Sequence, residues 1–151
     1  MVRHTISATT LIHAPAANVY DIIVDYHHTH PRILPKPPFV SLVVEQGGTG
    51  AGTVIRCQMR VLGRLQTFRA AITEPEPGCV LVETTNDGTT TTFTVEPSEH
   101  GQHAHVTITT EVSVRDGIVG KIERWLTTRL LRPTYEKELA QLAAVVANPA
   151  P

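Results

Sequence analysis

The sequence lacks several features that mark specialised classes of protein. It has only two cysteines, Cys57 and Cys79, which are too few for a disulfide scaffold and are expected to be small buried thiols. No run of about 18 apolar residues occurs, so no transmembrane helix and no stable membrane insertion are expected. The first residues alternate apolar and polar side chains and contain no signal-peptide core. These absences favour a cytoplasmic protein.

An excess of charge of one sign is also missing. The 151 residues include 13 Lys and Arg against 14 Asp and Glu, a formal net charge of -1. This balance gives no electrostatic footprint for nucleic acid, which is not expected as a partner. Hydrophobic residues make up 41% of the chain and charged residues 18%, as in a globular domain. We expect one domain over residues 1–147, followed by a frayed tail at 148–151.

Common catalytic and metal-binding motifs are absent as well. The chain contains no G-x-S-x-G, Walker A, H-E-x-x-H or paired C-x-x-C motif. The glycine-rich segment 47–52 joins two predicted strands and leads into no helix, so it is not expected to bind phosphate. No cofactor is expected. The motifs identify no catalytic residues.

What the sequence does contain is a long series of strand patterns. Apolar and polar residues alternate over residues 5–13, which predicts a half-buried strand. Six more strands are predicted between turn-rich segments, at residues 39–45, 53–62, 65–73, 79–85, 89–96 and 103–114. Because short turns connect them, these six strands are expected to form an antiparallel meander.

Helical periodicity appears in three places. Apolar residues from Val19 to Tyr26 recur at helical spacing after Pro15, which predicts a short helix. A second short helix or turn is expected between His30 and Leu34. Strong helix formers from Ile118 to about Val146 then predict a long C-terminal helix.

The long helix carries two apolar stripes that do not line up. The first stripe comprises Ile118, Ile122, Trp125, Leu126 and Arg129, and the second comprises Leu131, Tyr135, Leu139, Leu142 and Val146. At about 100° per residue the stripes lie more than a quarter-turn apart. A kink or break at Pro133 is therefore expected, since it would let both stripes face the sheet.

The order of elements predicts an α+β fold in which one long helix and two short ones cover the apolar face of the sheet. The residues assigned inward form the expected cavity lining: Ile55, Cys57, Met59, Phe68, Ala70, Phe93, Ile108, Ile122, Trp125 and Arg129. Arg129 would orient a ligand carboxylate or enolate, or else reach the rim or pair with an acid such as Glu83. A filled core without a cavity is the alternative.

Histidines gather after the first short helix. His27 and His30 lie three residues apart and are candidates for the mouth of the pocket, with an exposed polar loop as the alternative. No metal site is expected, because Asp25 is the only other potential ligand at suitable spacing.

Five strings, in order along the chain, resemble the START/Bet v 1-like (SRPBCC) superfamily, the group of polyketide cyclases, dehydrases and lipid transport proteins. The strings are residues 12–20, 31–35, 50–53, 74–78 and 139–142, and the resemblance extends from Ile6 to Val146. It implies a helix-grip fold: a seven-stranded curved antiparallel sheet around a long C-terminal helix, with a deep apolar cavity between them.

This resemblance implies no single activity. The first hypothesis is that the protein binds a small hydrophobic ligand, lipid-, quinone- or polyketide-like, between the sheet and the C-terminal helix. The second is an enzyme of the polyketide cyclase/dehydrase type, which would have an ionisable polar pair inside the cavity. The third is a protein-interaction module with a filled core and an exposed apolar patch. A homodimer is a further partnership that the sequence leaves open.

Overall fold

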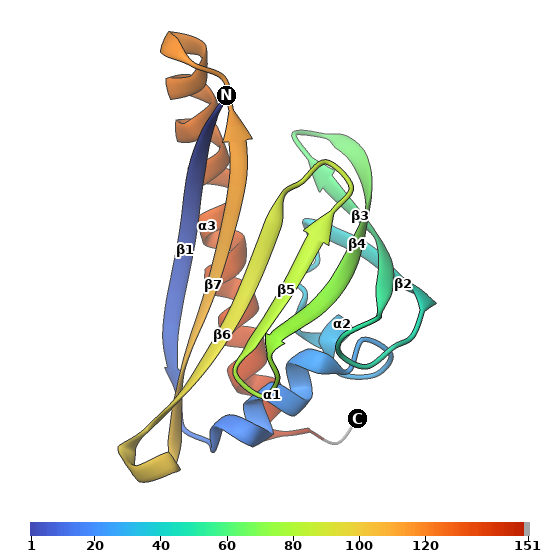
Figure 1. Cartoon of the computed structure of the whole chain (residues 1–151), viewed down its shortest axis with the longest axis vertical. Coiled ribbons are helices and arrows are strands. Elements are labelled where there is room, and N and C mark those ends of the chain that lie inside the picture. The colour runs from blue at the N-terminus through green and yellow to red at the C-terminus, as the bar shows by residue number, and fades with distance from the viewer. Residues whose placement is uncertain (150–151) are drawn as a thin grey trace.

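Seven strands form one antiparallel sheet in the computed structural model, which describes residues 1–149. The strands are β1 (Val2–Ile12), β2 (Phe39–Gln46), β3 (Val54–Val61), β4 (Arg64–Glu76), β5 (Val80–Thr85), β6 (Thr90–Ser98) and β7 (His103–Val114). Their order in the sheet is β1-β7-β6-β5-β4-β3-β2, so β2 to β7 form the predicted meander and β1 joins it beside β7. The sheet curves strongly, as Figure 1 shows.

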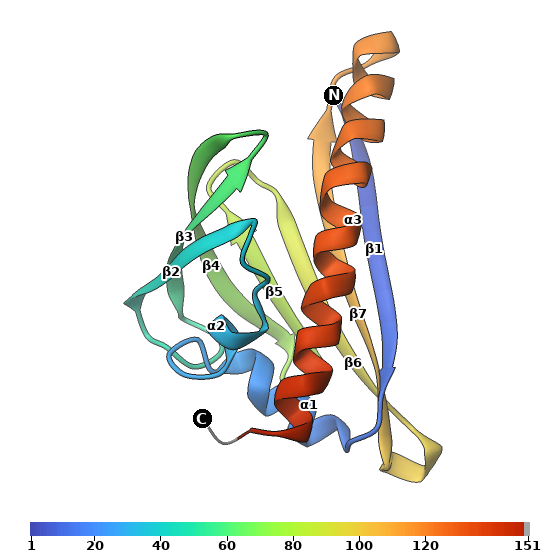
Figure 2. The same ribbon diagram turned by 180° about the vertical axis from the view of Figure 1, so that it is seen from behind.

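Helices cover the concave face of this sheet. Helices α1 (Ala16–Val24) and α2 (His30–Ile33) connect β1 to β2, a short turn η1 (Glu99–Gly101) precedes β7, and α3 (Gly117–Ala147) ends the fold. Figure 2 shows α3 running along the sheet with α1 and α2 near its C-terminal end. The predicted helix-grip architecture is thus confirmed. No helix within residues 1–149 combines the length and apolar character needed to span a membrane.

The core lies between α1, the second half of α3 and the middle strands. Period-two alternation in β6 and β7 buries Phe93, Val106 and Ile108, each at most 1% exposed. Leu139 and Leu142 of α3 pack against them from the other side and are 2% and 0% exposed. Burial of each such side chain stabilises the fold by roughly 1.5–3 kcal/mol. These contacts fix the rotation of α3 about its own axis.

Of the kink or break expected at Pro133, the break is wrong. Helix α3 continues through this residue, which lies on the exposed side of the helix. The C-terminal stripe is held by the core, and the helical turn then carries the N-terminal stripe away from the sheet. Ile122 and Trp125 accordingly remain 59% and 61% exposed. The two stripes are left on different sides of the molecule.

A glycine-rich turn between β2 and β3 fastens the sheet to the end of α1. The Tyr26 N–H donates to the Gly48 carbonyl at 2.9 Å, and the Gly50 N–H donates to the Val24 carbonyl at 3.0 Å. Gly48 has a φ of +146°, a backbone conformation in which a residue with a side chain would be strained. The turn thereby sets the position of the segment from Tyr26 to His30.

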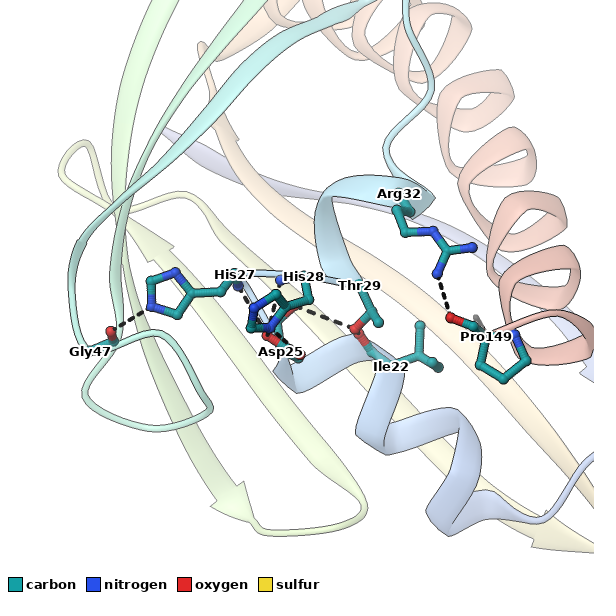
Figure 3. Close-up of polar contacts among 8 residues, drawn as sticks. All are labelled: Ile22, Asp25, His27, His28, Thr29, Arg32, Gly47 and Pro149. Carbon is teal, nitrogen blue, oxygen red and sulfur yellow. Dashed lines mark hydrogen bonds and ion pairs between the residues drawn. The ribbon is translucent and has the colours of Figure 1, made fainter. Parts of the chain in front are cut away.

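The chain beyond α3 returns to α2. The Arg32 guanidinium donates to the carbonyl oxygens of Asn148 and Pro149 at 3.2 Å and 2.7 Å, and Figure 3 includes the contact with Pro149. The first half of the predicted tail at 148–151 is therefore in contact with the domain. Residues 150 and 151 lie outside the described residues.

Candidate functional site

A cavity of about 380 Å³ lies between the concave face of the sheet and α3. This volume falls within the range of about 300–1,000 Å³ that is usual for small-molecule pockets. Six residues assigned inward from the sequence line it: Ile55, Cys57, Met59, Phe68, Ala70 and Phe93. Ile108 is fully buried opposite Phe93 in the strand register but does not line the cavity.

The three lining residues expected from the first half of α3 do not reach the cavity. Ile122, Trp125 and Arg129 all lie on the exposed side of the helix. The Arg129 guanidinium stacks on the Trp125 ring at 5.3 Å rather than pairing with Glu83. The cause is the helix rotation set by the core, which turns Leu131, Tyr135 and Glu138 towards the cavity instead.

The two histidines expected at the mouth have different positions. His27 is exposed, does not line the cavity, and its Nε2 contacts the Gly47 carbonyl at 3.2 Å (Figure 3). His30 is only 1% exposed and lies at the inner end of the cavity, not at its mouth. Within residues 1–149, no group of three or more His, Cys, Asp or Glu side chains is placed to hold a metal ion.

Asp25 explains why the histidine segment turns so sharply. Its carboxylate accepts the backbone N–H groups of His27 and His28, each at 3.1 Å, and lies within 3.1 Å of the His28 ring. The Thr29 hydroxyl donates to the Ile22 carbonyl at 2.7 Å (Figure 3). The Thr29 bond satisfies a carbonyl group at the C-terminal end of α1, and the bonds to Asp25 hold the turn that follows. The turn they form directs His30 inward.

The inner end of the cavity is polar. The Tyr26 hydroxyl donates to Glu83 Oε2 at 2.7 Å, and the His30 ring stacks on the Tyr26 ring with centroids 4.2 Å apart. His30 Nδ1 donates to the Ile23 carbonyl at 2.7 Å, which leaves Nε2 as the unprotonated nitrogen of the neutral ring. That Nε2 lies 3.7 Å from Glu83 Oε2, too far for a hydrogen bond.

Burial sets the charge of these groups. Desolvation lowers the pKa of His30 to about 4, so the ring is neutral near neutral pH. Desolvation also raises the pKa of Glu83 to about 7, although the Tyr26 hydrogen bond opposes this rise. The contact between His30 and Glu83 is therefore not a salt bridge between full charges. Glu83 has a pKa close to that of a working acid or base at neutral pH.

A second carboxyl group faces the same space from α3. Glu138 is 3% exposed and lines the cavity. Its carboxyl group has no hydrogen-bond or ion-pair partner among the described residues. Burial, followed by repulsion from Glu83, raises the pKa of Glu138 well above its usual value. Its carboxyl oxygens open onto the cavity, and an acid with a strongly raised pKa in such a cavity is a candidate functional group.

Hydroxyl groups form a chain along one wall. The Thr91 and Thr110 hydroxyls lie 2.8 Å apart, and the Thr110 hydroxyl lies 2.5 Å from the Tyr135 hydroxyl. Desolvation raises the pKa of Tyr135 to about 12, so its phenol stays protonated. The chain offers a ligand neutral donors and acceptors beside the two carboxyl groups.

The mouth of the cavity lies at the opposite end from His30. Gln66 and Thr67 at the start of β4 and Asn86 and Asp87 in the β5–β6 turn line the cavity and are exposed. Both hairpin ends lie at the same side of the molecule in Figure 1. The lining includes no lysine or arginine. The cavity thus leads from a polar rim through apolar walls to an acidic inner end.

From the sequence, Glu83 was named only as a possible partner of Arg129 and Glu138 was not named, although these two residues make the inner end acidic. Glu83 has the same strand phase as Leu81 and Thr85, which places a carboxyl group on the concave face. Glu138 follows Tyr135 by three positions and precedes Leu139, so it falls within the apolar stripe of the helix. An acid on a buried face was the available signal in both cases.

Comparisons with known proteins agree with this architecture. A family model described as polyketide cyclase / dehydrase and lipid transport matches residues 3–147. The KanY protein has a solved structure with a TM-score of 0.83 at 25% sequence identity, covering 98% of this chain and 100% of that chain. No curated protein sequence matches this chain.

Two further solved structures show the same fold at lower sequence identity. The Zhui aromatase/cyclase from Streptomyces sp. R1128 has a TM-score of 0.77 at 14% identity, covering 97% of this chain and 94% of that chain. A START superfamily protein from Mycobacterium smegmatis has a TM-score of 0.75 at 16% identity, with coverages of 97% and 99%. At these identities the likeness concerns the fold alone.

Proposed function

Because the chain belongs to the polyketide cyclase/dehydrase and lipid transport family, we propose that it binds a small, largely hydrophobic molecule in the cavity between the sheet and α3. The single observation that carries this proposal is the cavity of about 380 Å³ itself, with an apolar wall and a small set of convergent polar groups. A lipid-, quinone- or polyketide-like molecule fits this combination. Its apolar body would leave water, and its polar end would meet Tyr135, Glu83 and Glu138.

The interaction-module hypothesis receives less support. It requires a filled core, whereas an open space separates β3, β4 and β6 from α3. It also requires an exposed apolar patch, and Ile118, Ile122 and Trp125 do supply one. This hypothesis gives the cavity no function.

A pair of alanines in β4 provides the test. Ala70 is 2% exposed and faces the cavity, whereas its neighbour Ala71 lies on the convex face and is exposed. Ala70→Leu adds bulk to the cavity, and Ala71→Leu adds the same bulk outside it. Native mass spectrometry of the wild-type protein, followed by denaturing extraction, should find a co-purified small molecule.

The same spectra should find this molecule in Ala71→Leu and not in Ala70→Leu. If the wild-type protein carries nothing, isothermal titration with naphthylethanol replaces the co-purified molecule. Binding that is equal in the two leucine variants would contradict the proposal, and so would an absence of binding in both experiments.

Polyketide cyclase/dehydrase-type catalysis is a second candidate function. The observation that favours it is Glu83, which lines the cavity, accepts a hydrogen bond from the buried Tyr26 hydroxyl and has a pKa of about 7. The ionised Glu83 would take a proton from a carbon between two ketone groups. The resulting enolate carbon would attack a third ketone further along the same chain, and the neutral Glu138 would protonate the oxygen of that ketone.

Glu83→Gln separates the two candidate functions. The substitution keeps the shape of the side chain and removes its ability to take a proton. Under the catalytic candidate, turnover of a synthetic poly-β-ketone should fall by about 100-fold or more. A variant that binds the ketone and turns it over at the wild-type rate would rule out Glu83 as the base.

A further inference from the structure

The acidic inner end of the cavity lacks any positive partner. The titratable groups around Glu83 and Glu138 are Tyr26 after α1, His30 in α2, Cys57 in β3 and Tyr135 in α3, whereas Asp87 in the β5–β6 turn lines the cavity at its mouth. Burial keeps His30 neutral, and it also raises the pKa values of Tyr26, Cys57 and Tyr135, so these groups stay uncharged. Hydrogen bonds from Thr85 and Thr89 lower the pKa of Asp87, which remains an anion. Among residues 1–149, no lysine or arginine lines the cavity beside the two acids.

The two acids also have unused hydrogen-bonding capacity. Tyr26 occupies Oε2 of Glu83, and Oε1 of Glu83 has no hydrogen-bond partner among residues 1–149. Neither oxygen of Glu138 has a partner in that part of the chain either. Both side chains line the cavity, so a bound molecule can reach them. Burial disfavours a carboxylate that has no positive partner, and a cation on a ligand in this cavity would supply that partner to both acids.

We infer that the cavity selects an apolar ligand that carries an amino group, and that Glu83 and Glu138 hold the ammonium ion of that ligand between them. This inference rests on the proposed function and names its ligand class. An ammonium group offers three N–H donors, which suit the free oxygens of two carboxylates. A ligand with a carboxylate, such as a fatty acid, would meet like charge at the inner end and is excluded.

Binding of an ammonium ion has a distinctive dependence on pH. Glu83 has a pKa of about 7 in the free protein, and the pKa of Glu138 is raised well above its usual value. An aliphatic amine stays protonated near neutral pH. The ligand therefore favours the ionised acids, so binding releases protons and tightens as the pH rises from about 6 to about 8. A ligand ketone would accept hydrogen bonds from the neutral acids, and its binding would weaken over the same range.

Three naphthyl compounds of similar size test this inference by isothermal titration calorimetry. They are naphthylethylamine, naphthylethanol and methyl naphthyl ketone. At about pH 8 the amine should bind at least about 10-fold more tightly than the alcohol, which corresponds to about 1.4 kcal/mol. Titrations in two buffers of different ionisation enthalpy should show release of up to about one proton with the amine and about none with the alcohol.

Glutamine variants of three glutamates show which residues cause the preference for the amine over the alcohol. Glu138→Gln and Glu83→Gln should each remove most of the preference for the amine while they retain binding of the alcohol. Glu136 lies two residues before Glu138 on the exposed side of α3, so Glu136→Gln is the matched control and should keep the full preference. Retained alcohol binding shows that a variant has folded and that its cavity is intact.

Three results would overturn the inference. The first is equal affinity for the amine and the alcohol at about pH 8, and the second is tightest binding of the ketone at about pH 6. Either result would show that the ligand class is wrong. The proposed function would stand, since the cavity still binds an apolar molecule. The third is no binding of any of the three compounds, which would count against the ligand class and the proposed function together.

Discussion

The two halves of α3 have similar apolar content in sequence but different roles in the structure. In the second half, Leu139 and Leu142 are almost fully buried and Glu138 faces the cavity. In the first half, Ile118 and Trp125 are 77% and 61% exposed. Figure 2 shows that the first half extends along β1 and β7 away from α1 and α2. A single continuous helix thus belongs to the core at one end and to the surface at the other.

The exposure of the first half shows that an apolar stripe does not by itself identify the buried face of a helix. Packing against α1 and the sheet fixes the rotation of the second half, and the rigid helix then dictates the rotation of the first. Small or polar residues of the first half, Gly120, Thr127 and Thr128, turn towards the sheet side as a result: Gly120 is buried and Thr128 contacts His4 of β1 at 2.8 Å. The position of a residue in the core is decided by its neighbours in space.

Truncation of one apolar residue in each half gives the largest expected contrast. Leu142 is 0% exposed, so Leu142→Ala should lower the free energy of unfolding by roughly 2–5 kcal/mol through lost burial and a new void. Ile122→Ala should change it by less than about 0.5 kcal/mol. Urea denaturation followed by circular dichroism measures both. Equal losses in the two variants would mean that the halves do not differ as described.

Pro133 separates the halves and offers the next test. It lacks the N–H that would bond to the Arg129 carbonyl, and it lies on the exposed side of the helix. Pro133→Ala should therefore raise the free energy of unfolding by roughly 1–3 kcal/mol, without any change in ligand affinity. Thermal denaturation gives the comparison, with Glu136→Ala on the same exposed side as the control. A destabilised Pro133→Ala protein would show that the helix depends on a distortion at this residue.

The buried acids of the cavity predict a dependence of stability on pH. Glu83 has a folded pKa of about 7 and an unfolded value of 4.5, so its contribution to stability is lost as the pH rises from about 4.5 through 7. Glu83→Gln removes this loss. Compared with the wild-type protein, the variant should gain roughly 1–3 kcal/mol at pH 8 relative to pH 5. Urea denaturation at the two pH values measures the difference.

His30 acts in the opposite direction over part of the same range. Its folded pKa of about 4 lies below the unfolded value of 6.5, so stability increases as the pH rises between these values. The two trends partly cancel in the wild-type protein. A Glu83→Gln protein whose stability falls between pH 5 and pH 8 as much as that of the wild type would contradict the assignment of Glu83.

The smallest expected effect concerns Arg129. Its stacking on Trp125 at the surface is worth about 0.5–1 kcal/mol, so Arg129→Ala should lower stability by no more than this. Affinity for a cavity ligand should stay unchanged, because Arg129 does not line the cavity. Calorimetric titration of the variant and the wild-type protein makes the comparison. A 10-fold loss of affinity would restore Arg129 to the binding site.

Much of the fold could be predicted from the sequence because local patterns determine it. Alternation placed Ile55, Phe68 and Phe93 on the concave face, and the turn signals between strands set the meander. The first strand, predicted at residues 5–13, begins earlier in the structure, at Val2, because it pairs with the whole of β7. Such pairing is a long-range contact that a local pattern does not contain.

The candidate site was harder to predict, because its chemistry depends on contacts between distant segments. Tyr26, Glu83 and Glu138 come from three parts of the chain, and only the fold brings the two acids to one cavity and the Tyr26 hydroxyl to Glu83. The rotation of α3 decided whether Arg129 or Glu138 would face inward, and the sequence pattern alone favoured the wrong one. The charged groups expected in the cavity came down to one cation, Arg129, whereas the structure places two acids there, Glu83 and Glu138.

NMR titration of the protein with naphthylethanol most directly tests the central claim that the cavity between the sheet and α3 binds an apolar ligand. Backbone and methyl chemical shifts report on both halves of α3 in one experiment. Shift changes are expected at Ala70, Leu131 and Tyr135, and none at Ile122 and Trp125. Changes confined to Ile122 and Trp125 would place binding on the outer face of the helix and contradict the claim.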